Sequence, residues 1–134
     1  MTGGAPMPAA VLVVHDDQNI RDLAVSALRA VFLDAIGFDD PMVALDAIEA
    51  SSRVRVLVTR VAFGAGKLNG VALSRMVRMK RPGTKVVFVA RAENAPHAEG
   101  LGVVLPGPLD PDLLVATVSR LLVTREEDGE IASS

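Results

Sequence analysis

The sequence has no cysteine, tryptophan or tyrosine and only four phenylalanines. Without cysteine the chain can form neither a disulfide nor a thiolate metal site, so a reducing compartment such as the cytoplasm is the expected location. So few aromatic side chains leave little surface on which nucleobases could stack. The formal net charge of −2 gives no overall attraction to nucleic acid. Composition therefore predicts no nucleic-acid partner.

Long apolar runs are also missing. None approaches the roughly 20 residues of a membrane-spanning helix, and residues 1–10 lack the basic and apolar regions of a signal peptide. We therefore expect no membrane partner. The 134 residues, half of them hydrophobic, fit one domain with a core of its own. We interpret the chain as a flexible N-terminal arm (1–9), a domain (10–123) and an acidic C-terminal tail (124–134).

Short apolar segments alternate with segments of helical periodicity. Strands are predicted at 9–15, 33–38, 54–60, 85–90 and 101–107. Helices are predicted from residues 18, 41, 71 and 111, and between 91 and 100 Pro96 and Gly100 leave room for only a turn or two. Strands and helices in this order indicate a parallel sheet covered on both faces.

Helix starts and inner faces can also be predicted. Aspartates at N-cap positions precede three of the helices, and two are followed by proline at the first helical position: Asp17, Asp40 with Pro41, and Asp110 with Pro111. In the first helix, helical spacing predicts an inward stripe of Ile20, Leu23, Ala24, Ala27, Leu28 and Val31. In the last helix it predicts Leu113, Leu114, Val118, Leu121 and Leu122.

In sheets of this kind the functional crevice lies beyond the carboxyl ends of the strands. His15, Asp16 and Asp17 follow the first strand, and the third strand ends on Arg60 although the rest of it is strongly apolar. A buried guanidinium needs a partner, because an isolated charge is costly to remove from water. These residues are therefore the candidates for a site.

Residues 10 to 123 resemble the receiver domain of bacterial two-component response regulators. Four blocks support the resemblance, in the family's order: VLVVHDDQNIRDL, VLVTR, RPGTKVVFVA and LPGPLDPDLLVATVSRLL. The resemblance implies a flavodoxin-like α/β fold, a doubly wound five-stranded parallel sheet of strand order 2-1-3-4-5 built from five βα units.

Receivers phosphorylate an aspartate with the help of an acidic cluster that holds Mg²⁺, a hydroxyl residue and a lysine. The resemblance places His15 at the first acidic position and keeps Asp16 at the second, with Asp17 beside it. The phosphoacceptor position is occupied by Arg60. The hydroxyl, lysine and switch-aromatic positions hold Ala90, Gly107 and Val104, respectively.

These replacements predict a degenerate pseudo-receiver without a phosphoacceptor aspartate. We expect no enzymatic activity and no cofactor, and the loss of the first acid argues against Mg²⁺ binding. The expected role is phosphorylation-independent protein–protein interaction in a phosphorelay, with a histidine kinase or another signalling protein as partner. A homodimer is also compatible with the family.

Other interpretations stay open. The strand-end crevice around Asp16 and Arg60 could bind an anion or a small molecule, or serve an enzyme, because guanidinium groups suit carboxylates and phosphates. Phosphorylation could occur on Asp16 or Asp17 instead. A metal site from His15, His97 and Asp16 is a weaker alternative, since the histidines show no ligand spacing.

A final hypothesis concerns the arginine itself. Because the chain lacks the lysine but keeps the two aspartates, we predict that Arg60 turns into the pocket and pairs with Asp16 as a fixed internal cation, with Asp17 as a less favoured partner. The alternative is that Arg60 extends into solvent. An exposed pair would stabilise the fold by about 0–1 kcal/mol, whereas breaking a buried pair can cost about 3–5 kcal/mol.

Overall fold

Strands and helices alternate along the chain as the sequence pattern predicts. The computed structural model describes residues 10–51, 53–63 and 66–133, with side chains as far as Val123, so the predicted arm at 1–9 lies outside the described residues. Within these ranges the strands are β1 (Ala10–Val14), β2 (Asp34–Phe38), β3 (Val54–Arg60), β4 (Lys85–Ala90) and β5 (Val103–Pro106). The helices are α1 (Gln18–Ala30), α2 (Pro41–Ala50), α3 (Gly70–Lys80), α4 (Ala95–Ala98) and α5 (Pro111–Ser133).

The strands form one parallel sheet of order β2-β1-β3-β4-β5. This arrangement confirms the flavodoxin-like fold implied by the resemblance. In the register, Val14 lies opposite Thr59, Arg60 opposite Val89, and Ala90 opposite Pro106. The carboxyl ends of β1, β3, β4 and β5 therefore meet at one edge of the sheet.

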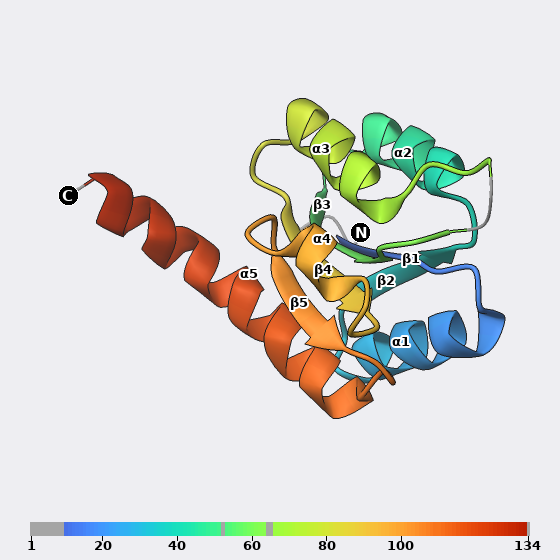
Figure 1. The fold of residues 1–134 in the computed structure, drawn as a ribbon. Helices are drawn as coiled ribbons and strands as arrows, with labels where there is room; N and C mark the ends of the chain where they lie inside the picture. The colour runs from blue at the N-terminus through green and yellow to red at the C-terminus, as the bar shows by residue number, and fades with distance from the viewer. Residues whose placement is uncertain (1–9, 52, 64–65, 134) are drawn as a thin grey trace.

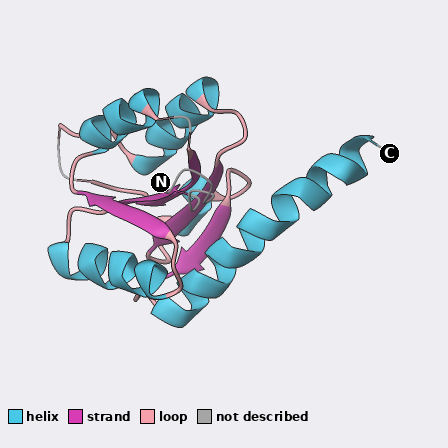
Figure 2. Cartoon of the chain, turned by 180° about the vertical axis from the view of Figure 1, so that it is seen from behind, coloured by secondary structure: helices cyan, strands magenta, loops and turns pink. Residues whose placement is uncertain are grey.

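Helices cover both faces of the sheet (Figures 1 and 2). Helices α2 and α3 pack together on one face and α1 and α5 on the other. Side chains alternate along each strand and separate two cores. Leu12, Leu57 and Phe88 face α2 and α3, whereas the other core contains Val11, Val13, Val56, Val58 and Val87.

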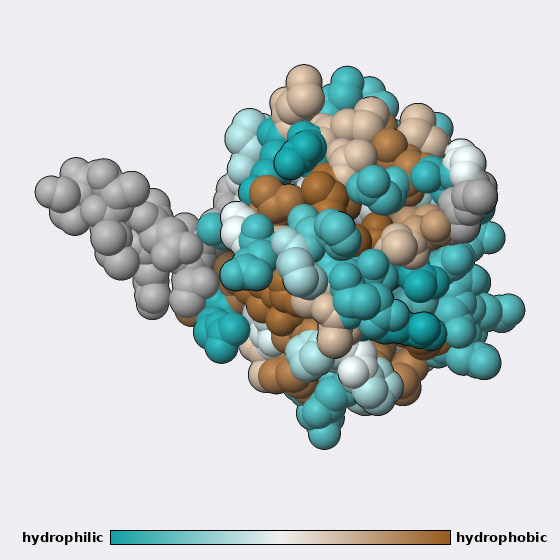
Figure 3. All heavy atoms as spheres, in the orientation of Figure 1, coloured by the Kyte–Doolittle hydropathy of each residue, from teal (hydrophilic) through white to brown (hydrophobic). Residues whose placement is uncertain are grey.

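Helix α4 is short and buries little of the sheet beneath it. It has four residues, and Ala98 is its buried one. The predicted limit of a turn or two in this segment is therefore confirmed. Val104, on the neighbouring β5, is only partly buried against the core below, and Figure 3 shows apolar surface on the side of the molecule where α3, α4 and β5 lie.

The inward stripes are narrower than predicted. In α1, Ala24 and Leu28 are buried, but Leu23 and Val31 are 44% and 42% exposed. In α5, Leu113 is 43% exposed. The periodicity identifies the correct side of each helix, but residues at the margin of the stripe lie beyond the edge of the packed interface and stay exposed to solvent.

The last helix is longer than its apolar pattern indicates. Helix α5 continues to Ser133, through the segment predicted as an acidic tail from residue 124. Figure 1 shows this end of the helix projecting beyond the body of the domain. A helix can continue past its last packed residue because its backbone hydrogen bonds are internal and this segment contains no proline. No described helix is both long and apolar enough to cross a membrane.

Helix α1 ends in a Schellman motif with an unusual residue. Phe32 has a positive φ of 66°, and its side chain is 88% exposed. The Phe32 N–H donates to the Arg29 carbonyl and the Leu33 N–H donates to the Leu28 carbonyl, which are the two hydrogen bonds of the motif. Glycine is preferred at this position because other L-residues are strained there.

We therefore expect Phe32→Gly to stabilise the fold by about 1 kcal/mol, through relief of left-handed strain. Urea unfolding followed by circular dichroism would measure the change. Val31→Gly is the matched control, since Val31 has an ordinary φ of −106° and should gain nothing from glycine. Equal effects of the two substitutions would contradict the strain argument.

Candidate functional site

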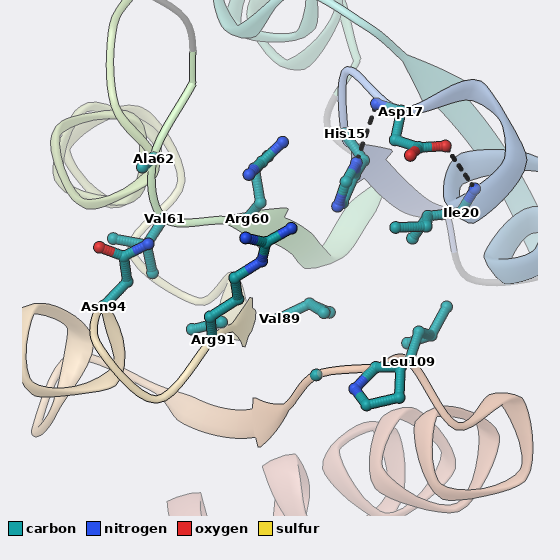
Figure 4. A pocket seen from close by; sticks show the side chains of 13 residues that line it. His15, Asp17, Ile20, Arg60, Val61, Ala62, Val89, Arg91, Asn94 and Leu109 are labelled. Atoms are coloured by element: carbon teal, nitrogen blue, oxygen red, sulfur yellow. Dashed lines mark hydrogen bonds between the residues drawn. The ribbon is translucent and has the colours of Figure 1, made fainter.

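A cavity of about 380 Å³ lies at the carboxyl ends of four strands. Its lining comes from segments far apart in sequence that the parallel sheet brings to one edge. The lining residues are His15, Asp17 and Ile20 after β1; Arg60, Val61 and Ala62 at the end of β3; Val89, Ala90, Arg91 and Asn94 around the end of β4; and Gly107, Pro108 and Leu109 after β5. Figure 4 shows these side chains around the opening.

His15 is buried, with 6% of its surface exposed. Its Nδ1 accepts a hydrogen bond from the backbone N–H of Asp17 at 3.0 Å, which requires that nitrogen to be unprotonated. Burial, followed by the positive charge of Arg60, lowers the pKa of His15 from its ordinary value of 6.5, while Asp16 and Asp17 act in the opposite direction. The imidazole is therefore neutral near pH 7, with its proton on Nε2.

The neutral state of His15 predicts a loss of stability in acid. Between about pH 6.5 and the lower folded-state pKa, the unfolded chain binds a proton that the folded chain does not, so the free energy of unfolding falls as the pH drops. Asp16 has its own pKa below 3.8 and loses its contribution only at lower pH. Urea unfolding at about pH 7.5 and about pH 5 would measure the change.

His15→Asn is the control for this experiment, because the amide oxygen can accept the Asp17 N–H and asparagine does not titrate. We expect the variant to lose less stability than the wild type between the two pH values. Groups with charges near His15 are Asp16, Asp17, Arg21 and Arg60, and all are retained in the variant. Parallel pH profiles for the two proteins would rule out His15 as the source.

Arg60 turns toward β1 and contacts Asp16. Its Nη1 donates to Asp16 Oδ1 at 2.5 Å, so the pairing predicted from the sequence is formed. Partial burial pushes the pKa of Asp16 upward, but the hydrogen bond and charge of Arg60 outweigh this effect and lower the pKa below 3.8. The two side chains are 28% and 36% exposed, so water screens the pair and its contribution belongs to the range of about 0–1 kcal/mol.

Asp17 has a different partner. Its Oδ1 accepts the backbone N–H groups of Asn19 and Ile20, at 2.9 and 3.2 Å, as the N-cap of α1. This confirms the N-cap predicted for Asp17. Each of the two carboxylates after β1 is therefore already bound within the chain, Asp16 by a guanidinium and Asp17 by backbone N–H groups.

The remaining predicted positions divide into two groups. Ala90 and Gly107 line the cavity, and the Gly107 N–H donates to the Ala90 carbonyl at 3.0 Å. The peptide bond between Gly107 and Pro108 is cis. Val104 is not part of the lining and packs against the core on the α2 and α3 face. Asp16 reaches the site through Arg60, without lining the cavity.

Arg91 and Asn94 are lining residues that the sequence reasoning did not identify. Arg91 directly follows the apolar strand that ends at Ala90, so it is signalled in the sequence as Arg60 is, by an arginine at the end of an apolar run. His97, suggested as a second metal ligand, is exposed on α4 and does not line the cavity. Across the described ranges, no three His, Asp or Glu side chains are grouped so that they could hold a metal ion.

Comparison with known proteins gives matches in structure alone. No protein-family model and no curated protein matches the sequence. NtrX from Brucella abortus, in complex with ATP, aligns with a TM-score of 0.82 and 27% identity over 94% of this chain. The alignment covers only 29% of the NtrX chain.

Two smaller proteins align over almost their full length. A CheY-like response regulator receiver domain protein from Methanospirillum hungatei JF-1 has a TM-score of 0.79 and 20% identity, over 90% of this chain and 98% of its own. The chemotaxis protein CheY4 of Vibrio cholerae has a TM-score of 0.73 and 22% identity, over 85% and 98%. The chain therefore has the CheY-like fold of response regulator receiver domains.

Proposed function

We propose that this chain is a receiver-like domain that works without aspartyl phosphorylation. It acts in the cytoplasm as a protein-interaction module of a two-component or phosphorelay pathway, and it is not an enzyme. One observation supports this proposal above the others: the end of β3 carries Arg60, and Arg60 is paired with Asp16. The side chain that would accept a phosphoryl group in a receiver is here a cation.

The surrounding chemistry agrees with this role. An acyl phosphate can form only on a carboxylate, and a guanidinium has no nucleophilic oxygen. Mg²⁺ prefers oxygen ligands such as carboxylates, but Asp16 is held by Arg60 and Asp17 caps α1. Ala90 and Gly107 supply neither a hydroxyl nor an amine to a phosphoryl group.

We expect no acyl phosphate after incubation with Mg²⁺ and acetyl phosphate, or with a histidine kinase. The aspartates that remain are occupied, and no acceptor stands at the end of β3. Intact-protein mass spectrometry would detect the addition of one phosphoryl group. An active receiver domain treated in the same way serves as the positive control.

A hydroxylamine-sensitive phosphoryl group on the wild-type chain would overturn the proposal. Asp16→Asn and Asp17→Asn would then identify the acceptor, because one of these variants would lose the modification. These substitutions test the interpretation, left open by the sequence, in which one of the two aspartates replaces the missing acceptor.

The partner in this proposal is a histidine kinase or another signalling protein, and a homodimer is a second form of the same role. Two features could serve such a partner: the apolar surface on the side where α3, α4 and β5 lie (Figure 3), and α5, which extends beyond the body of the domain (Figure 1). Because Arg60 stands where a phosphoacceptor would be needed, binding to such a partner should not depend on a phosphodonor.

A further inference from the structure

His15 has one donor with no partner. Its Nδ1 is occupied by the Asp17 N–H, and Nε2 makes no hydrogen bond to any residue that the structure describes. Figure 4 shows the ring at the wall of the cavity, with its second nitrogen directed toward the opening. The His15 side chain is 8% exposed, and Nε2 is not one of the described buried nitrogens that lack a partner. This N–H therefore faces accessible space and is available to a ligand.

Two guanidinium groups flank the same space. Arg60 reaches it from the end of β3, and Arg91 reaches it from the residue after β4 (Figure 4). Arg60 is compensated by Asp16. Arg91 forms no ion pair within the described part of the chain. One positive charge at the cavity is therefore left without a local counter-charge.

The carboxylates near the cavity do not change this balance. Asp17 is the acidic residue in the lining, and its Oδ1 accepts two backbone N–H groups at the start of α1. Asp16 is held by Arg60. The donors that line the cavity are the His15 Nε2–H and the guanidinium groups of Arg91 and Arg60, and all of them suit an anion.

The rest of the wall is suited to an organic group. Apolar side chains line the cavity beside the cationic ones: Ile20, Val61, Val89 and Leu109. A volume of about 380 Å³ lies in the range of small-molecule sites. The Asn94 amide, across the cavity from His15 in Figure 4, adds a polar group that could orient a ligand.

The geometry points to a site for a small organic oxyanion, a carboxylate or a phosphate monoester, bound without covalent chemistry. Arg91 and Arg60 hold the charged end, His15 donates Nε2–H to it, and the apolar wall takes the organic part. This inference is independent of the proposed interaction with a protein partner. It also differs from receiver chemistry, because no bond to the chain is formed and no metal ion is needed.

Titration of the full chain with three probes would test the site. Phenyl phosphate and benzoate combine an oxyanion with an apolar ring, and benzyl alcohol has the ring without the charge. Binding is followed by isothermal titration calorimetry and by amide shifts in ¹⁵N spectra. We expect saturable, 1:1 binding of phenyl phosphate or benzoate, with shifts near His15, Arg60 and Arg91, and at least about tenfold weaker binding of benzyl alcohol.

The relative affinity of the two anions then distinguishes a phosphate ligand from a carboxylate ligand. Arg91→Gln should weaken binding of the preferred anion by about tenfold or more. Arg78→Gln is the matched control, because Arg78 is an exposed arginine in the last turn of α3 and does not line the cavity. The affinity of Arg78→Gln for the preferred anion should stay within about twofold of the wild-type value.

His15→Asn provides a second variant, which keeps the acceptor for the Asp17 N–H and removes the Nε2 donor. We expect weaker binding of the same anion with an unchanged midpoint of urea unfolding near neutral pH. The inference is wrong if neither anion binds saturably below about 10 mM, a limit that corresponds to very weak association. It is also wrong if Arg91→Gln has no greater effect than Arg78→Gln, or if the neutral probe binds as well as the anions.

Discussion

Gly70→Ala is expected to destabilise the fold by about 3 kcal/mol, as severe overpacking against backbone does. A Cβ atom at residue 70 would lie 1.9 Å from the carbonyl oxygen of Arg60. That oxygen belongs to the backbone and cannot rotate away. The Gly70 N–H also donates to the Val61 carbonyl at 2.8 Å, so separating the start of α3 from the end of β3 would strain or break this bond.

Urea unfolding of Gly70→Ala and Gly100→Ala would test this contact. Gly100 has a positive φ of 82° and no atom within 4 Å of its would-be Cβ, so alanine there should cost only about 1 kcal/mol from left-handed strain. The contrast separates a steric clash from a conformational preference. If the two variants were equally stable, the close approach of α3 to the end of β3 would not be a constraint on the fold.

Arg60→Asp should produce the largest change at the cavity. The substitution removes the pair with Asp16 and adds a carboxylate close to Asp16 and Asp17, so like charges repel. We expect a loss of about 2 kcal/mol in the absence of divalent cations, from the lost pair and the new repulsion together. The new carboxylate and that of Asp16, which Arg60 no longer holds, are, however, ligands that Mg²⁺ accepts.

Added Mg²⁺ should therefore raise the melting temperature of Arg60→Asp by mass action, and it should leave the wild type unchanged. Arg60→Asn is the matched control: it loses the ion pair without adding charge, so it should cost at most about 1 kcal/mol and show no response to Mg²⁺. Thermal unfolding of the three proteins, with and without Mg²⁺, gives all of these values. A wild type that responds to Mg²⁺ as strongly as Arg60→Asp would refute the role of Arg60 as an internal cation.

Arg60 contributes little to the stability of the fold but changes the chemistry of the cavity. Because the pair with Asp16 is partly exposed, it contributes far less to stability than a buried pair would. The pair nevertheless occupies Asp16, one of the two carboxylates that follow β1. Arg60 also lines the cavity, where Arg91 is a second guanidinium.

The positions of strands and helices followed from the sequence because their signals are local. β3 and β4 have the predicted bounds, since each is a short apolar run bounded by polar or turn-forming residues. α1, α2 and α5 begin where an aspartate can accept backbone N–H groups. The strand order was implied by the family resemblance, because a hydrophobic run does not specify which strand will lie beside it.

Contacts between segments decided the site. The sequence placed Arg60 at the end of β3, but only the register of β1 against β3 brought it to Asp16, while Asp17 was taken by the start of α1. Arg91 was identified as a lining residue only from the structure, in which the loop after β4 lies at the same edge of the sheet. Periodicity and capping report the nearest neighbours along the chain, whereas the direction of a side chain at a strand end depends on charges and volumes that arrive from other strands.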